Sequence, residues 1–136
     1  MTRKYVDEIT YLAIGCAIEV HRQLGPGLLE SLYEKCFIRE LSLKNISYKK
    51  QEIIPVYYKG WNLDAELRYD VLVENLLIVE LKAIEGILPV HHAVLLTYMK
   101  LLQKPKGLLI NFNCTNIFKE GQKTLVNEYY GLLPEF

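Results

Sequence analysis

The sequence lacks several features that mark whole classes of protein. Its 16 lysine and arginine residues balance 16 aspartate and glutamate residues, so the formal net charge is zero. A protein that binds nucleic acid by charge alone would be basic, and this balance argues against that class. No stretch reaches about 18 consecutive apolar residues, which argues against a membrane span. The sequence also has no internal repeat, no glycine-rich phosphate loop and no Ser/His/Asp nucleophile pattern.

Cysteine is scarce, and the three cysteines are far apart and odd in number: Cys16, Cys36 and Cys114. This spacing gives neither a zinc-type pair nor a disulfide framework. Apolar neighbours surround each one, which predicts buried, reduced thiols in a cytoplasmic protein. The apolar stretch 9–18 matches the core of a secretory signal in length, but acidic residues flank it and no cleavage motif follows. We therefore expect a cytoplasmic protein without a membrane partner.

The chain has 136 residues, a length typical of one domain, so we expect a single domain over residues 1–136. Hydrophobic residues make up 51% of it and charged residues 24%, as in globular proteins. The charges are unevenly distributed, because residues 51–85 hold 3 basic and 7 acidic side chains while both flanks are slightly basic. An acidic centre between basic flanks suits a cation site that faces a polyanion, although ordinary surface scatter gives the same counts.

Hydrophobic spacing of about 3.6 residues predicts two helices at the start of the chain, over residues 5–24 and 28–44. A tight Gly25-Pro26-Gly27 corner joins them. The period then changes to two, which predicts β-strands, the first two paired as a hairpin around Gly60-Trp61-Asn62. The predicted strands cover residues 47–59, 63–73, 76–83 and 107–112.

A third helix is predicted to start at Pro89, a favoured first-turn residue, and to run to about residue 103. The tail from residue 118 is either a last strand or a short helix. The resulting order, ααβββαβ, predicts an α/β sandwich with a mixed β-sheet.

The two acidic residues Asp70 and Glu80 lie on consecutive predicted strands. A two-residue turn at positions 74 and 75 would mix apolar and charged side chains on both faces of this strand pair. A three-residue turn pairs Asp70 with Glu80 and collects five apolar residues on one face. Burial favours this second register, with an irregular turn conformation at Asn75 or Leu76. The five apolar residues are Val71, Val73, Leu77, Val79 and Leu81.

The other face of this strand pair brings Asp70, Glu80 and Lys82 together beside Leu72 and Ile78. Two adjacent carboxylates repel each other unless a cation joins them or one is protonated. Carboxylate oxygens suit Mg²⁺, and a neighbouring lysine stabilises the charge on a phosphate under attack. The spacing leaves open the alternative that the three side chains form a structural salt-bridge cluster.

Two motifs occur together in the order and spacing of one known family. Residues 27–33 spell G-x-x-E-x-x-Y, and Asp70 with Glu80-Leu81-Lys82 spells a D…E-x-K core. Together they resemble the bacterial GxxExxY proteins, a branch of the PD-(D/E)XK nuclease superfamily. The resemblance runs from about residue 5 to about residue 123.

The resemblance implies a restriction-endonuclease-like sandwich, in which helices flank a central mixed β-sheet. It also implies Mg²⁺-dependent hydrolysis of phosphodiester bonds in DNA or RNA, with Mn²⁺ as a substitute ion and nucleic acid as the partner. Asp70, Glu80 and the carbonyl of Leu81 would hold the metal, and Lys82 would position or activate the attacking water. Glu30 matches an acid that such nucleases place near the metal through water.

Three further residues are candidates for substrate binding: Tyr33, His91 and Tyr98. Tyr33 lies on the same helix face as Glu30, and its alternative role is packing with a hydrogen bond to a carboxylate. His91 matches a histidine common in the family and is expected near phosphate, whereas His92 is expected to be solvent-exposed. No zinc site is expected, because the sequence has no HExxH motif and no second histidine pair.

One position departs from the family pattern. Related nucleases carry Gln-x-x-x-Tyr on the helix after the E-x-K strand, whereas residues 94–98 here are V-L-L-T-Y. Val94 therefore replaces the glutamine, at a position expected to face the metal one turn before Tyr98. An apolar residue there removes a group that would orient substrate or water.

The predicted hairpin also carries aromatic residues near its turn: Tyr57, Tyr58 and Trp61. Aromatic side chains stack on the bases of single-stranded nucleic acids in many binding proteins. The other interpretation, which we expect here, is that these rings cover the hairpin itself.

Three functional hypotheses follow. The first is a metal-dependent nuclease, which the intact set of Asp70, Glu80 and Lys82 favours. The second is a nuclease-fold module that binds nucleic acid or a protein partner with little or no turnover, which Val94 and the zero net charge favour. The third is a small oligomeric structural protein whose acidic hairpin is a salt-bridge cluster. A chain this short would need a homodimer or a partner to grip a duplex.

Overall fold

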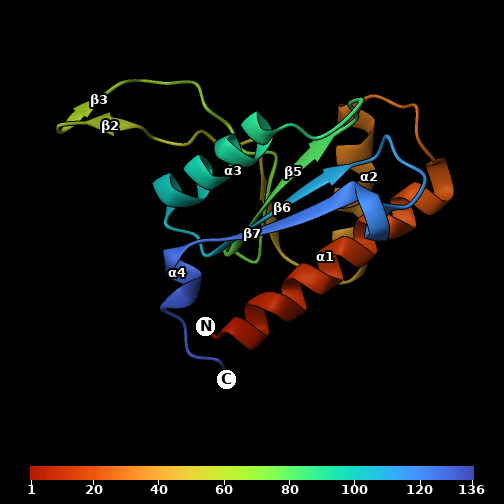
Figure 1. Ribbon diagram of the computed structural model, residues 1–136, viewed down its shortest axis with the longest axis horizontal. Coiled ribbons are helices and arrows are strands. Elements are labelled where there is room, and N and C mark those ends of the chain that lie inside the picture. The colour runs from red at the N-terminus through yellow and green to blue at the C-terminus, as the bar shows by residue number, and fades with distance from the viewer.

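A mixed β-sheet of five strands forms the centre of the computed structural model, which describes residues 1–136 (Figure 1). The strand order is β1-β4-β5-β6-β7, with β5 and β6 parallel and the other neighbours antiparallel. Helices pack on both faces, so the predicted α/β sandwich with a mixed central sheet is confirmed. The strands are β1 (Tyr48–Lys50), β4 (Val71–Val73), β5 (Leu77–Lys82), β6 (Lys106–Asn111) and β7 (Gln122–Val126).

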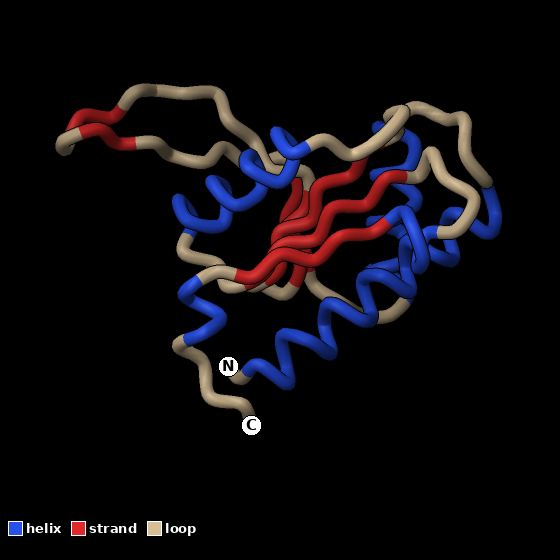
Figure 2. Tube along the Cα trace, in the orientation of Figure 1, coloured by secondary structure: helices blue, strands red, loops and turns tan.

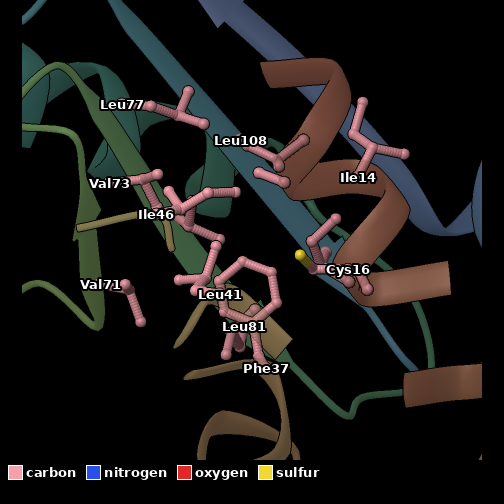
Figure 3. Close-up of a cluster of buried hydrophobic side chains, with 14 of the residues drawn as sticks. Ile14, Cys16, Phe37, Leu41, Ile46, Val71, Val73, Leu77, Leu81 and Leu108 are labelled. Carbon is pink, nitrogen blue, oxygen red and sulfur yellow. The ribbon is translucent and has the colours of Figure 1, made fainter. Parts of the chain in front are cut away.

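Two helices, α1 (Arg3–Leu24) and α2 (Glu30–Leu43), cover one face of the sheet. Both were predicted to within two residues at each end. The corner between them needs glycine, because Gly25 and Gly27 have φ angles of 66° and 107°, which other residues rarely adopt. Figure 3 shows apolar side chains of both helices meeting those of the sheet strands in the larger core.

The cysteines are free thiols, as predicted, but only one of them is fully buried. Cys16 lies in the core beneath α1 (Figure 3), and burial raises the pKa of its thiol to about 11. Cys36 and Cys114 are partly buried at the edge of the same core. Burial also raises the pKa of the Cys114 thiol, so neither Cys16 nor Cys114 has the lowered pKa of a reactive cysteine.

One helix, α3 (Pro89–Leu102), covers the opposite face and makes the crossover between the parallel strands β5 and β6. Its start at Pro89 is as predicted. Leu95 and Met99 are the fully buried residues of this helix. Gly107 on β6 allows their close approach, because a Cβ atom there would lie 2.7 Å from Met99 Sδ and 2.8 Å from Leu95 Cδ2.

The predicted hairpin over residues 47–73 is present, but it is not one continuous ribbon. At the base of the hairpin, β1 and β4 pair inside the main sheet. Further out, β2 (Tyr57–Tyr58) and β3 (Trp61–Asn62) form a separate two-stranded sheet. An isolated bridge between Ile53 and Arg68 lies between the two parts. Figure 2 shows the outer ribbon projecting from the body of the molecule on long loops.

The C-terminal tail contains both a strand and a short helix, the two alternatives that the sequence offers for this segment. A π-helical turn, η1 (Ile117–Gly121), leads into the edge strand β7, and a short helix, α4 (Glu128–Gly131), follows. The tail then returns to the start of α1, so the two termini lie side by side (Figure 1). The N–H of Arg3 donates to the carbonyl of Pro134 at 2.8 Å. None of the helices combines the length and the apolar composition that a membrane crossing requires.

Candidate functional site

The register between β4 and β5 places the acidic residues. Val71 pairs with Val79 and Val73 pairs with Leu77, which leaves a three-residue turn between the strands. The turn is irregular as expected, because Asn75 has a φ of 55°. The predicted register is therefore confirmed, and Asp70, directly before β4, lies opposite Glu80.

The two faces of this strand pair separate as the burial argument requires. All five apolar residues of the first face are fully or almost fully buried in the core beneath α1 and α2. On the other face, Leu72 and Ile78 pack with Leu95 of α3. Because strand side chains alternate, Glu80 and Lys82 point to this α3 side of the sheet. The site thus lies where β5 emerges between α2 and α3.

Asp70 and Glu80 are in direct contact. The backbone N–H of Asp70 donates to Glu80 Oε2 at 3.2 Å, and Asp70 Oδ2 accepts the N–H of Leu81 at 2.8 Å. Glu80 is only 5% exposed. Burial, followed by the hydrogen bond and the charge of Asp70, raises the pKa of Glu80 to about 9. Without a cation, Glu80 therefore holds a proton at neutral pH, because two touching carboxylates cannot both ionise at low cost.

Lys82 is half-buried and makes no ion pair. The two salt bridges of the structure, Arg22 with Glu19 and Lys106 with Asp7, both lie elsewhere. The alternative of a structural salt-bridge cluster is therefore wrong for this lysine. Its charge still lowers the pKa of Glu80, which places the ammonium near the carboxylates without locking it to them.

A hollow of about 380 Å³ opens beside Asp70 on the α2 side. Glu30 and Glu34 of α2 line it together with Gln51, Asp70 and Leu81. Glu30 Oε2 accepts the N–H of Ala83 at 3.2 Å, which ties the start of α2 to the end of β5. The fold therefore brings Glu30, predicted from its motif alone, to the same hollow as Asp70.

Sequence reasoning missed three residues of this hollow, Ser31, Glu34 and Gln51. The Gln51 side-chain amide donates to Glu34 Oε1 at 2.7 Å and to Asp70 Oδ1 at 3.2 Å. The sequence did contain an indication for Glu34, since this residue lies one helical turn after Glu30 on the same face of the helix. Gln51 had none, because only the pairing of β1 with β4 carries its backbone to Asp70, whose carbonyl accepts the Gln51 N–H at 3.0 Å.

Asn111 was also missed. It is buried on β6 beside Lys82, and its side chain binds the backbone N–H and carbonyl of Ile84. These bonds fix the chain directly after the E-x-K strand. A single asparagine at a strand end carries no sequence signal of such a role.

Tyr98 of α3 lies near the carboxylates. Burial, then the charges of Glu80 and Asp70, raises the pKa of the Tyr98 phenol, which therefore stays a hydrogen-bond donor. Val94, one turn earlier on the same helix face, is 39% exposed and so is not a core residue. The position that carries glutamine in related nucleases is therefore open to solvent here.

The two histidines stand in the first turn of α3. His91 Nδ1 accepts the N–H of Leu88 at 2.8 Å, so the ring proton of the neutral side chain is at Nε2. No hydrogen bond links His91 to Asp70 or Glu80. The expectation that His92 is solvent-exposed is wrong, because it is half-buried and its Nε2 atom is buried without a hydrogen-bond partner.

Tyr33 lies in the core rather than at the surface. It is fully buried, and its ring stacks on Phe112 with centroids 4.2 Å apart. Its hydroxyl donates to the carbonyl of Gly25 at 2.6 Å and accepts the N–H of Leu28, so it binds the backbone of the corner and not a carboxylate. Any effect of Tyr33 on substrate has to act through the corner that it stabilises, which carries Glu30 into the site.

The donor set suits a hard divalent cation. No cluster of three or more His, Cys, Asp or Glu side chains converges in the structure. The available donors are instead the Asp70 and Glu80 carboxylates and backbone carbonyls, a set typical of Mg²⁺, which keeps several water ligands. A buried acid that must otherwise hold a proton beside a second carboxylate fits this role, because a cation would replace the proton.

Comparison with known proteins gave one match. A family model described as the PD-(D/E)XK nuclease superfamily matches residues 7–124. The matched segment includes α2, the paired carboxylates, Lys82 and α3. Searches of curated proteins and of solved structures gave no match.

Proposed function

This chain belongs to the PD-(D/E)XK nuclease superfamily, and from that membership we propose that it is a metal-dependent nuclease that hydrolyses phosphodiester bonds in DNA or RNA. The observation that carries the proposal is the contact between Asp70 and the buried Glu80, next to a lysine without an ion pair. The G-x-x-E-x-x-Y motif at residues 27–33 supports the narrower assignment to the GxxExxY branch.

Asp70, Glu80 and the carbonyl of Leu81 would hold the metal, Mg²⁺ or Mn²⁺. When bound, such an ion polarises a phosphate oxygen and makes a water molecule more acidic. Asp70 is already oriented for this task, because Gln51 and the Leu81 N–H each occupy one of its oxygens. Glu30, on the same hollow, would hold a water molecule at the outer side of the site.

The remaining residues would act on the phosphate. The ammonium of Lys82 is free to orient the attacking water and to stabilise the negative charge that develops on the phosphate. The Tyr98 phenol and the Nε2–H of His91 are hydrogen-bond donors on α3 and would bind substrate oxygens. Tyr33 would support the site indirectly by holding the corner before α2.

A second candidate function is binding of nucleic acid or of a protein partner with little or no turnover. The solvent-exposed Val94 favours it, because no side-chain amide projects from this face of α3. The two candidates share the metal site and differ in the rate of hydrolysis.

Metal binding is tested by thermal unfolding. Ca²⁺ or Mn²⁺ should raise the melting temperature of the protein, because an ion that binds only the folded state stabilises it. Asp70→Asn and Glu80→Gln should abolish this shift, whereas Glu8→Gln, on the exposed face of α1, should retain it. The same shift in all four proteins would contradict the metal site.

Hydrolysis is tested with Mg²⁺ or Mn²⁺ and a panel of single- and double-stranded DNA and RNA, with Asp70→Ala as the blank. Lys82→Ala should lose turnover but keep both its melting temperature and its metal-induced shift, since Lys82 makes no ion pair. A stable and fully active Lys82→Ala would remove Lys82 from the mechanism. Metal binding without hydrolysis of any substrate would favour the binding module.

A further inference from the structure

We infer that the projecting ribbon of residues 52–69, here called the arm, is a stacking site for the bases of single-stranded nucleic acid. The inference rests on the proposed function and specifies its substrate class. Figures 1 and 2 show the arm extending away from the sheet and the helices, with β2 and β3 at its tip. These two strands pair only with each other.

The tip has a defined conformation. Tyr57 pairs with Asn62 and Tyr58 pairs with Trp61, which puts the turn at Lys59-Gly60 instead of the predicted Gly60-Trp61-Asn62. Lys59 and Gly60 have φ angles of 49° and 79°, both positive as a two-residue type I′ hairpin turn requires.

The aromatic side chains of the tip are exposed, so the expectation that they cover the hairpin is wrong. Tyr57 is 62% exposed, Tyr58 58% and Trp61 68%. The cross-strand partners Tyr58 and Trp61 share one face of the ribbon, and Tyr57 lies on the other face. Rings on both faces of a two-stranded ribbon cannot all pack on the body of the same molecule, which leaves them available to a ligand.

The arm is anchored at its base and not at its tip. Ile54 and Tyr69 are buried in the smaller core with Leu95 and Met99 of α3. The N–H of Ile54 donates to the carbonyl of Leu67 at 2.8 Å. The aromatic tip therefore contributes little to the core, and its large exposed rings need an explanation outside folding.

The charge of the tip suits a nucleic acid. Residues 53–63 contain one charged side chain, Lys59, and no acidic one, although the surrounding segment is acidic. The Lys59 ammonium lies over the Tyr58 ring, 5.5 Å from its centroid. Aromatic rings that stack on bases, with a lysine to neutralise phosphate, are the combination that single-strand-binding surfaces use. Duplex bases are already stacked and would not fit it.

The arm starts and ends at the candidate site. Its two flanking residues, Gln51 and Asp70, are hydrogen-bonded to each other through both backbone and side chain. At about 3.3 Å per step along the chain, the nine steps from Trp61 to Asp70 span at most about 30 Å. A single-stranded nucleic acid whose bases stack on the tip can therefore extend to the carboxylates, provided that it is several nucleotides long.

The chain offers its own spectroscopic probe, because Trp61 is its single tryptophan. With Ca²⁺ in place of Mg²⁺ to suppress cleavage, a 20-nucleotide oligothymidylate should quench the Trp61 emission, and a 20-base-pair duplex should not. Tyr58→Ala should weaken oligothymidylate binding about tenfold in fluorescence anisotropy, as expected for the loss of one stacking ring. Tyr58→Phe should restore the affinity. Tyr11→Ala, which removes an exposed tyrosine of α1, is the matched control and should bind normally.

Two further measurements separate this inference from the proposed function. Hydrolysis of a small nitrophenyl phosphodiester, which cannot reach the tip, should be the same in Tyr58→Ala and the wild type and absent in Asp70→Ala. If Tyr58→Ala and Trp61→Ala bind and cleave the long oligonucleotide normally while Asp70→Ala does not, the arm inference is overturned and the nuclease stands. Quenching of Trp61 without any hydrolysis would support the arm and contradict the nuclease. If Tyr58→Ala and Trp61→Ala keep the nucleic-acid affinity of the wild type but no longer form a dimer that the wild type forms in analytical ultracentrifugation, the arm is a protein contact and the inference is overturned.

Discussion

At the scale of single residues, the chemistry of the site depends on the burial of Glu80. The carboxyl group lies almost entirely out of water and touches Asp70, and these two facts raise its pKa from about 4.5 to about 9. In the metal-free protein it therefore donates a proton to a hydrogen bond instead of repelling its neighbour. Metal binding has to displace this proton, so affinity should increase with pH across this interval.

The first prediction is a pH dependence of stability in the metal-free protein. Between pH 4.5 and about pH 9 the folded chain holds one more proton than the unfolded chain, so stability should fall as the pH rises through this window. Glu80→Gln keeps a hydrogen-bond donor without the ionisation and should be the more stable protein at pH 8, by on the order of 3 kcal/mol. Urea unfolding at pH 5 and pH 8 in EDTA measures both. Equal pH slopes in Glu80→Gln and wild type would contradict the assignment, and Glu8→Gln should behave as wild type.

At the scale of elements, α3 couples the smaller core to the site. Its inner face packs on β6 through Leu95 and Met99, and its Tyr98 lies near the carboxylates. Gly107 sets the distance between helix and strand, because a Cβ atom at this position would collide with both buried side chains. The helix α3 is therefore held close to the sheet, and the helix face that carries Tyr98 borders the site.

Gly107→Ala should lower the free energy of unfolding by about 1–3 kcal/mol, the usual cost of overpacking a dense core. It should also displace α3 and reduce the activity of the site. Gly86→Ala is the control, since a Cβ atom there meets nothing within 4 Å and should cost little. Chemical denaturation of the two variants gives the comparison, and equal stabilities would show that α3 can shift without penalty.

Val94→Gln should leave the melting temperature within about 2 °C of the wild type, because surface substitutions rarely cost more than about 0.5 kcal/mol. The new amide would stand one turn from Tyr98, where it can bind substrate or water, and hydrolysis should increase. Leu96→Gln, exposed to a similar extent on another face of α3, should leave the rate unchanged. A large fall in melting temperature would show that Val94 packs as a core residue. Equal rates of hydrolysis in the two variants would show that position 94 has no role in hydrolysis.

At the scale of the whole molecule, the two ends of the chain hold each other. The Arg3 guanidinium donates to the carbonyls of Tyr130 and Gly131 at 3.2 and 2.6 Å, and the Tyr130 hydroxyl donates to Asp7. The start of the long helix α1 is thereby tied to the short helix α4 near the C-terminus. This closure lies at the opposite end of the molecule from the site and the corner before α2 (Figure 1).

Arg3→Ala should therefore destabilise the fold without affecting the site. The loss of its two hydrogen bonds should cost about 1 kcal/mol, or roughly 3 °C in melting temperature. Lys4→Ala, which removes an exposed cation from the same helical turn, should have no comparable effect. Metal-induced shifts should be equal in both proteins, and a smaller shift in Arg3→Ala would indicate that the two ends of the molecule are coupled.

The helices and the register of the acidic strand pair could be predicted because both depend on local patterns. A one-residue slip between β4 and β5 would turn the apolar side chains of one of these two strands toward the charged face, so the alternation in the sequence permits only the register that pairs Asp70 with Glu80. The order of helices and strands along the chain followed from the same periodicities. The position of Glu30 in the site could be predicted only from its motif.

The features of the site that could not be predicted depend on contacts between segments far apart in the chain. Gln51 reaches Asp70 through the pairing of β1 with β4, and Glu80 is buried because strands and α3 surround it, neither of which leaves a local pattern. Tyr33 was a candidate for substrate binding and lies in the core, whereas Trp61 was expected to cover the hairpin and is exposed. The sequence could not separate these cases, since an aromatic residue at a regular spacing is equally compatible with a core and with an exposed arm. Periodicity in a sequence specifies which side chains share a face. Whether that face meets protein, water or substrate depends on the packing of elements far apart in the chain, and so do the pKa of a carboxylate and the freedom of a lysine.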